Sequence, residues 1–133
     1  MTLGRGTVVL VALDRTVGHE QRGMRPCIVV SDPDVVADQR FPLVGIVPVT
    51  GTPGEGALYP SLRPGKSGLT KPSYALADHL RSVDKRRIRR VFGQVAPAEL
   101  GAIDDGLLLF LGLHDRETSP STPPPADSGA PTA

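Results

Sequence analysis

The sequence contains no tryptophan, two tyrosines and three phenylalanines among its 133 residues. Proteins that hold single-stranded nucleic acid by stacking need exposed aromatic side chains, so this composition argues against a stacking platform. The single cysteine, Cys27, excludes an intrachain disulfide and a cysteine-based zinc site. Because its neighbours are apolar, we interpret Cys27 as a small core residue and not as a nucleophile.

Long apolar runs are absent as well. No run approaches the ~20 residues of a membrane-spanning helix, and the N-terminus lacks the basic and then apolar pattern of a signal peptide. We therefore expect a cytoplasmic protein with no membrane partner. The formal net charge is +1, of which His114–Ala133 contributes −2. The +3 left on the remainder is compatible with a phosphate-bearing partner.

Composition divides the chain into two parts. Residues 1–113 contain the apolar segments and are expected to form one small domain. Residues 114–133 are rich in proline, serine, threonine and alanine and poor in large apolar residues. Such a segment buries too little surface to offset its ordering entropy, so we expect a disordered tail.

The domain is expected to be mainly β with one C-terminal helix. Apolar segments bounded by turn residues predict strands at Thr7–Leu13, Pro26–Ser31, Leu43–Thr50, Ser73–Val83 and Arg90–Ala96, with a short one within Ala57–Leu62. Pro48 indicates that its strand is an edge strand or is bulged. Helical spacing after Pro97 predicts a helix that Gly112 ends, and Asp32–Asp38 is expected to form a short helical turn. Short strands with one late helix are typical of a small barrel on which the helix packs.

Two charged residues precede the second expected strand. Arg25 offers a planar fork of donors suited to a phosphate, although a surface arginine paired with Glu20 explains the same pattern. Glu20 is either that salt-bridge partner or a proton acceptor held by the guanidinium. The residues alone leave both alternatives open.

Other polar residues also have two interpretations. The hydroxyl of Thr50, at the end of a strand, either donates to a phosphate or caps the following turn. His19 and His79 are either catalytic bases or solvated side chains. The basic run Arg81–Arg90 suits a phosphate-tracking surface, a solvated turn or an acidic partner. No Gly-rich phosphate loop and no clustered metal motif is present, so neither cofactor nor metal is expected.

These motifs, taken together, closely resemble the MazF/PemK family of type II toxins. The family pattern G-x-E-Q-x-G-x-R-P, followed by an apolar strand and Ser, is met by Gly18–Ser31. The other matching segments are Arg5–Val8, Val47–Thr50, Gly68–Ser73 and Gly93–Val95 leading to Leu100. The resemblance covers nearly all of residues 3–113.

The resemblance implies an SH3-like small barrel of the CcdB/MazF/PemK type that forms a homodimer. It also implies a metal-independent, sequence-specific endoribonuclease that leaves a 2′,3′-cyclic phosphate and a 5′-hydroxyl on single-stranded RNA. A cognate antitoxin protein would inhibit it. By position, Arg25 and Thr50 match the family's catalytic arginine and threonine, and Glu20 matches a carboxylate important in some members. His79 stands where the family often has glutamine, which alters base preference or brings His79 into the proton chemistry.

The resulting hypothesis is a toxin in which Arg25 and Thr50 hold the phosphate and Glu20, or else His19, accepts the 2′-proton. Hydrogen bonding to base edges is expected to dominate over stacking. The residues expected to contact RNA are His19, Gln21, Arg22, Pro48, Ser73, His79, Arg81, Arg86 and Arg87. Two alternatives stand beside it: a toxin of the same barrel that poisons DNA gyrase without hydrolysis, and an inactive nucleic-acid binder.

Overall fold

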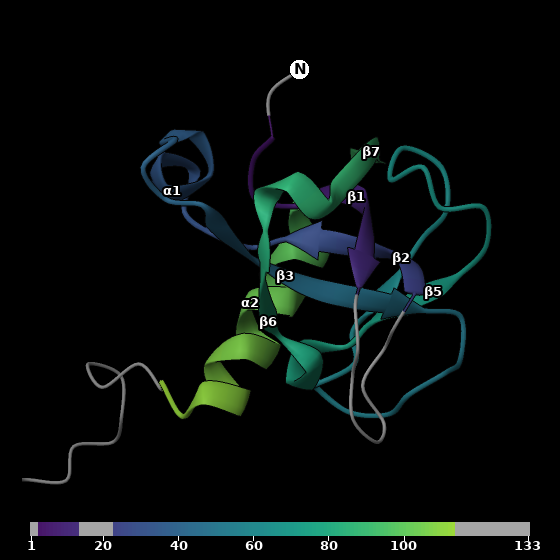
Figure 1. Cartoon of the computed structure of the whole chain (residues 1–133). Coiled ribbons are helices and arrows are strands. Elements are labelled where there is room, and N and C mark those ends of the chain that lie inside the picture. The colour runs from purple at the N-terminus through teal and green to yellow at the C-terminus, as the bar shows by residue number, and fades with distance from the viewer. Residues whose placement is uncertain (1–2, 14–22, 114–133) are drawn as a thin grey trace, which may run out of the picture.

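The computed structural model describes residues 3–13 and 23–113, and the statements below concern these residues. The predicted tail at residues 114–133 and the loop at residues 14–22 lie outside them. The elements along the chain are β1 (Thr7–Leu13), β2 (Gly23–Val29), α1 (Pro33–Ala37), β3 (Leu43–Thr50), β4 (Ser61–Leu62), β5 (Ser73–Ala75), the 3-10 turn η1 (Ala77–His79), β6 (Arg81–Asp84), the 3-10 turn η2 (Lys85–Arg87), β7 (Ile88–Gln94) and α2 (Pro97–Leu111) (Figure 1).

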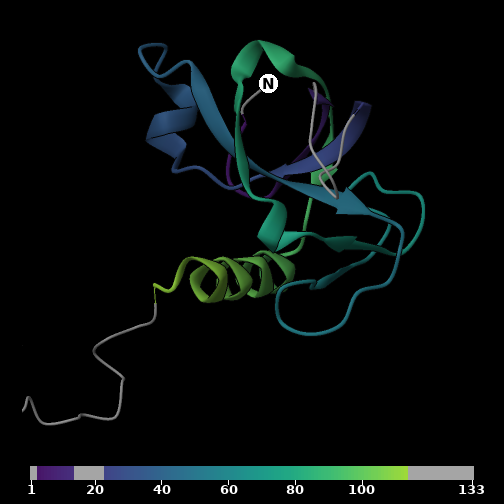
Figure 2. The same cartoon turned by 60° about the horizontal axis from the view of Figure 1, so that its bottom comes forward.

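The strands form one curled antiparallel sheet. Its order is β4-β5-β3-β2-β1-β7, and β6 also pairs with β3. Because η2 links β6 directly to β7, the two outer strands of the β6-β3-β2-β1-β7 segment are drawn toward each other. Figure 2 shows the resulting half-barrel end-on, with α2 lying outside it. The predicted mainly β fold with one C-terminal helix is confirmed.

Both faces of the central strands are buried. On β1, Val8 belongs to a core that includes Ile103 of α2, whereas Val9 and Val11 belong to a second core inside the curl. This alternation follows from the strand period of two residues, which sends neighbouring side chains to opposite faces. The strands therefore read as continuous apolar runs, which is why the sequence located β1 and β3 at their observed bounds.

The predicted strand Ser73–Val83 is wrong as a single element. The chain forms β5, turns through η1, and resumes as β6. Both short strands pair with β3, β6 along its first half and β5 at its end. The chain therefore has to bend between them to follow the curl of the sheet, and periodicity along the sequence does not report that bend.

Pro48 was predicted to mark an edge strand or a bulged one. The edge alternative is wrong, because β3 pairs with β2, β5 and β6, and the pairs found in these three ladders show no register shift. Pro48 lies opposite Cys27 of β2, and its carbonyl accepts from Leu76 N–H at 2.9 Å on the other side. The N and O atoms of a strand residue point the same way. The missing N–H of Pro48 therefore faces the gap between β6 and β5, where no ladder hydrogen bond is lost.

Helix α2 begins and ends as the sequence predicts. Pro97 occupies its first turn, and the Glu99 carboxylate accepts from Ala96 N–H at 3.0 Å. Alanine has no side-chain acceptor, so only the glutamate half of a capping box is present. At the other end Gly112 adopts φ +71°, and Leu113 N–H donates to Leu108 O at 2.8 Å. This left-handed cap closes the helix.

Candidate functional site

The strand register brings Arg25 and Thr50 to the same end of the half-barrel. Cys27 pairs with Pro48 and Val29 with Ile46 in the antiparallel β2–β3 ladder. The ladder ends at Cys27 and Pro48; if the same register is continued two residues beyond that pair, Arg25 falls opposite Thr50. Directly opposed residues share a face of the sheet, so a cation and a hydroxyl share this end of the barrel.

The Arg25 side chain lies on the concave face of the sheet. Arg25 is two residues from Cys27, which places both on one face, and it pairs with the buried Val11 of β1. Arg25 itself is exposed. An exposed guanidinium at the rim of an apolar concavity is accessible to a phosphate from solvent.

Cys27 shows that two guanidinium groups act on this concavity. Burial raises the pKa of its thiol to about 12, although Arg81 and Arg25 both pull that pKa downward. Cys27 is fully buried, and its Sγ lies 3.6 Å from Arg25 O. The interpretation of Cys27 as an inert core residue fits this burial.

Thr50 borders a pocket of about 420 Å³, named here the Thr50 pocket. Its lining residues are Thr50, Thr52, Pro53, Gly54, Tyr59, Leu76 and His79. Thr50 Oγ1 accepts from Thr52 N–H at 3.1 Å, so the predicted turn-capping role is present. Accepting leaves the hydroxyl hydrogen available for a further acceptor, so the capping role and the phosphate role are compatible.

His79 of η1 lines this pocket, and Asp78 lies behind it, outside the lining. His79 Nε2 lies 3.7 Å from Asp78 Oδ1, and the Tyr59 hydroxyl donates to Asp78 Oδ2 at 2.7 Å. That hydrogen bond is the main reason why the pKa of Tyr59 is raised above its ordinary value. Among the described residues, Asp78 Oδ1 and His79 Nδ1 are the buried side-chain atoms without a hydrogen-bond partner. Buried polar atoms of this kind are rare and call for an explanation.

The basic run is not a uniform surface. Lys85 Nζ donates to Val35 O at 2.6 Å and to Asp38 O at 3.0 Å, so Lys85 holds α1 in place. Arg87 Nη1 donates to Ala12 O at 3.3 Å. These two residues serve the fold, whatever else they do.

Arg86 and Arg81 differ from these anchors. Arg86 is exposed and pairs with Asp84 at 3.0 Å, an ion pair that lowers the pKa of Asp84 to about 2. Arg81 begins β6 opposite Ile46 and is partly buried. Within the basic run, Arg81 follows the pocket residue His79 by two positions, and it lies on the concave face of the sheet, opposite Ile46.

Ser73 does not fit the predicted RNA contact. It is 4 % exposed, and its hydroxyl donates to Lys71 O at 2.9 Å. The structure gives it a role in the turn before β5. Four other predicted site residues lie outside the described part of the chain: His19, Glu20, Gln21 and Arg22.

Sequence reasoning missed Tyr59 and Asp78. Tyr59 lies in the Gly- and Pro-rich segment before β4, and nothing in its spacing connects it with η1 nineteen residues later. Asp78 adjoins His79, which was a weak signal for a paired carboxylate. Only the folded chain joins the two with Thr50.

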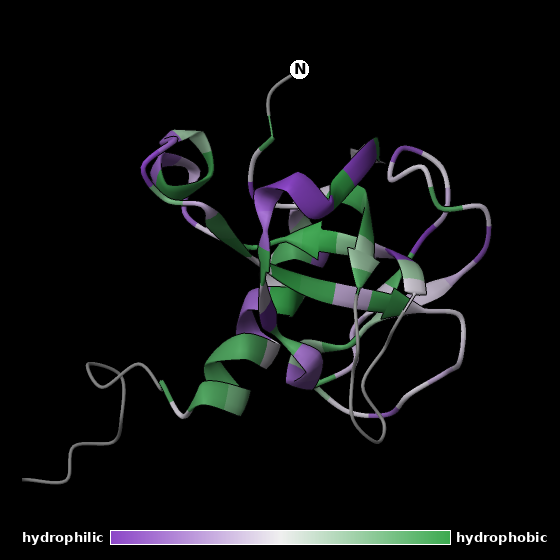
Figure 3. Cartoon of the chain, viewed as in Figure 1, coloured by the Kyte–Doolittle hydropathy of each residue, from purple (hydrophilic) through white to green (hydrophobic). Residues whose placement is uncertain are grey.

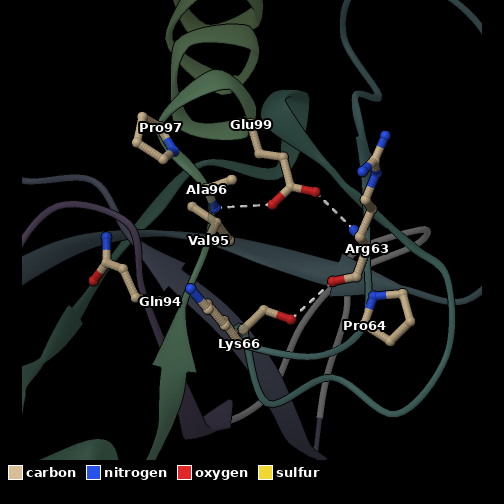
Figure 4. A pocket seen from close by; sticks show the side chains of 9 residues that line it. Arg63, Pro64, Lys66, Gln94, Val95, Ala96, Pro97 and Glu99 are labelled. Atoms are coloured by element: carbon tan, nitrogen blue, oxygen red, sulfur yellow. Dashed lines mark hydrogen bonds between the residues drawn. The ribbon is translucent and has the colours of Figure 1, made fainter.

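A second pocket of about 410 Å³ lies where β7 passes into α2, and it is named here the Glu99 pocket (Figure 4). The Glu99 carboxylate bridges Arg63 N–H at 2.7 Å and Ala96 N–H at 3.0 Å. Ser67 Oγ donates to Arg63 O at 2.9 Å. The polar groups of this pocket therefore tie the loop before β5 to the helix.

In the described part of the chain, no three His, Cys, Asp or Glu side chains gather in a way that would hold a metal ion. The described helices include none with the length and apolar character needed to cross a bilayer.

Solved structures show the same fold. MazF from Deinococcus radiodurans superposes with a TM-score of 0.68 at 28 % identity, covering 84 % of this chain and 98 % of that one. An endoribonuclease from a mycobacterial species, in complex with its cognate antitoxin, gives 0.65 at 25 % identity over 84 % and 96 %. A MazE–MazF structure from Deinococcus radiodurans gives 0.64 at 27 % identity over 86 % and 99 %.

The half-barrel with its C-terminal helix is thus the fold of toxins from toxin–antitoxin systems. The chain belongs to the PemK-like, MazF-like toxins of type II toxin–antitoxin systems, a family of endoribonucleases whose model matches residues 4–111. The resemblance found in the sequence is confirmed, and the gyrase-poison alternative receives no support from these comparisons.

Proposed function

We propose that this toxin is a sequence-specific endoribonuclease that cuts single-stranded RNA without a metal ion and leaves 2′,3′-cyclic phosphate and 5′-hydroxyl ends. The proposal is supported by the exposed Arg25 on β2, by Thr50 at the end of the neighbouring strand β3, where it lines the Thr50 pocket, and by the β2–β3 register, which sets the two residues across from each other when it is continued beyond its last pair. A cation and a hydroxyl donor on one rim suit a phosphodiester, whose non-bridging oxygens gain charge as the phosphorane forms.

Arg25 holds this charge by donating from its guanidinium, and Thr50 donates to a non-bridging oxygen. Arg25 is unsuited to accept the 2′-proton, because an arginine stays protonated at neutral pH. The family resemblance offers Glu20 as the proton acceptor, and Glu20 lies outside the described residues. The described residues offer another candidate, which is developed in the next subsection.

RNA enters along the rim of the half-barrel. We assign direct contacts to His79 in the Thr50 pocket and to Arg81 and Arg86 on the basic side, with His19, Gln21 and Arg22 contributing from the neighbouring loop. The predicted RNA contact of Pro48 is not kept, because its side chain is fully buried in the sheet. Arg87 contributes charge from its position against β1. Ser73 is left out of this set because its hydroxyl is buried and already donates.

The partners we propose are a cognate antitoxin and a second copy of the chain. The last turns of α2 are hydrophobic in sequence (Figure 3). Large apolar side chains are exposed there, at Leu108, Leu109, Phe110, Leu111 and Leu113. Contiguous apolar surface on a small protein marks an interface, and we assign this one to a homodimer in the cytoplasm. Sedimentation of the wild type against Leu109→Glu tests this: the variant should be monomeric, and an unchanged mass would contradict the assignment.

The test of the function is to incubate the purified toxin with a long RNA in EDTA and to sequence and chemically map the cut ends. We expect cuts at one short sequence, with cyclic phosphate on one side and 5′-hydroxyl on the other. Absence of cutting, or cutting only after Mg²⁺ is added, would contradict the proposal. A parallel DNA gyrase assay should show no inhibition.

A further inference from the structure

His79, Asp78 and Tyr59 form a polar chain that the family-based assignment of Arg25 and Thr50 leaves unused. Asp78 Oδ2 accepts the Tyr59 hydroxyl at 2.7 Å, which leaves Oδ1 facing His79 Nε2 at 3.7 Å. His79 lines the same pocket as Thr50. The pocket therefore joins a phosphate-binding hydroxyl to an imidazole that is backed by a carboxylate.

The hydrogen bonding of this group is incomplete. Asp78 Oδ1 and His79 Nδ1 are buried without partners among the described residues. A buried polar group without a partner destabilises the fold, so its presence calls for an explanation, and a role in function is one. A substrate hydroxyl that enters the pocket would supply the missing partner, and the 3.7 Å contact would shorten as the imidazole becomes charged.

We propose that His79 is the base that takes the proton from the RNA 2′-hydroxyl and that Asp78, held by Tyr59, is its positioning residue. The proposal rests on the ribonuclease function proposed above. The 2′-proton passes to Nδ1, the ring nitrogen that does not face Asp78; Nδ1 is buried in the free protein, so the step includes a rotation of the His79 ring that brings Nδ1 into the pocket. The 2′-oxygen then bonds to phosphorus, and the bond from phosphorus to the 5′-oxygen breaks as that oxygen takes a proton from solvent water. The imidazolium returns its proton to water after the products leave.

The arrangement follows the general logic of an oriented base. A carboxylate beside an imidazole fixes the ring and attracts the positive charge that forms when the proton is accepted. Asp78 is itself oriented by Tyr59, so the chain has three members, of which only His79 contacts the substrate. Glutamine, which the family often has at this position, could hydrogen-bond a base but could not accept a proton.

The charged and titratable groups around His79 come from several elements. Asp78 is in direct contact with His79, and Tyr59 is in direct contact with Asp78. Arg81 begins the strand that follows η1. Helix α2, which packs against η1, carries Asp104 and Asp105, and Asp104 is ion-paired with Arg5. Asp105→Asn is therefore a suitable control for charge changes on α2.

The first experiment measures kcat/KM against pH for the wild type, His79→Gln and Asp105→Asn on an RNA containing the mapped sequence. We expect His79→Gln to lose about 10²–10⁴-fold in kcat/KM and to lose the acid limb of the profile. RNA binding should change less than about threefold, and Asp105→Asn should match the wild type. A His79→Gln enzyme that keeps its rate and its acid limb would overturn the proposal.

The second experiment restores the base chemically. Added imidazole should recover part of the activity of His79→Ala but none of that of Thr50→Ala. A sulfur leaving group at the scissile 5′ position leaves without protonation, so an RNA that carries it would restore cleavage by a variant that has lost its general acid. His79→Gln has lost a base in this proposal, and this RNA should not rescue it. Rescue would make His79 the acid and overturn the assignment as base. If His79→Ala does not fold, the pH profiles of His79→Gln and Asp78→Asn decide.

Two further variants separate this proposal from its alternatives. Asp78→Asn and Tyr59→Phe should cost roughly tenfold and shift the acid limb, whereas a merely structural role would leave the limb in place. Glu20→Gln should keep the acid limb of the pH profile. If Glu20→Gln loses that limb and His79→Gln keeps it, Glu20 is the base. If the wild type cuts no RNA, the function proposed above has failed, whereas a cutting wild type with an equally active His79→Gln contradicts only the role of His79.

Discussion

The Thr50 pocket and the Glu99 pocket are nearly equal in size, at about 420 and 410 Å³, and differ in how their polar groups are used. In the Glu99 pocket, one carboxylate bridges the Arg63 and Ala96 amides, and the Ser67 hydroxyl donates to a nearby carbonyl. At the Thr50 pocket, Nδ1 of the lining residue His79 and Oδ1 of Asp78 behind it are buried without hydrogen-bond partners among the described residues.

This difference teaches more about function than volume does. Satisfied polar groups stabilise one conformation and have little left to offer a ligand, whereas unsatisfied ones are a cost that a bound substrate can remove. We therefore assign the Glu99 pocket to stability and the Thr50 pocket to chemistry. Matched substitutions in the two pockets test this division.

The largest effect should come from Arg25→Ala, compared with Arg63→Ala in the Glu99 pocket. Removing the group that holds the phosphorane charge should lower cleavage roughly 10³-fold. Arg63 contributes its backbone amide to Glu99 and is exposed, so Arg63→Ala should cut normally. Single-turnover rates measure both, with circular dichroism to check folding. An Arg25→Ala variant that cuts at the wild-type rate would remove the basis of the site.

The next effect should come from the hydroxyls. Thr50→Val removes one donor to the phosphate and should slow cleavage about 10²-fold, whereas Thr50→Ser should retain most activity. Ser67→Ala removes a buried hydroxyl of the Glu99 pocket and should leave cleavage unchanged. Equal losses in Thr50→Val and Ser67→Ala would show that both act through stability.

Glu99→Ala should give the converse result. Two backbone amides lose their acceptor, so we expect the free energy of unfolding to fall by about 1–3 kcal/mol. The folded fraction should cut RNA at the normal rate. Urea unfolding provides the measurement, with Asp105→Asn on the exposed side of α2 as a control for removing a negative charge. A rate defect at full folding would move function into the Glu99 pocket.

The smallest effect concerns the exposed pair of Asp84 and Arg86, which belongs to neither pocket. The folded-state pKa of Asp84 is about 2, below its ordinary 3.8, so ionised Asp84 favours the folded state. Its contribution is present above about pH 4 and is lost as the pH falls toward 2. Asp84→Asn should therefore show a slightly shallower fall of stability over this window in urea unfolding. An identical slope would mean that the pair contributes nothing measurable.

The site was only partly predictable. Arg25 and Thr50 were predicted because a strand start and a strand end carried polar residues in a recognisable motif, and their roles stay predictions. Ser73 was assigned to RNA because the motif includes it, but its burial depends on the turn that precedes β5. Tyr59 could not be found, because its hydrogen bond to Asp78 joins a loop to a 3-10 turn.

The sequence by itself determined the elements whose signals are local: the apolar strands Thr7–Leu13 and Leu43–Thr50, the start of α2 at Pro97 and its end before Gly112. The bounds of these elements are set by short-range sterics, capping and side-chain periodicity, which all depend on residues close together in the sequence. Only the tertiary structure decided that Pro48 belongs to a central strand and that His79 borders Thr50. Both depend on the bend at η1, where pairing with the curled β3 outweighs the strand periodicity of Ser73–Val83.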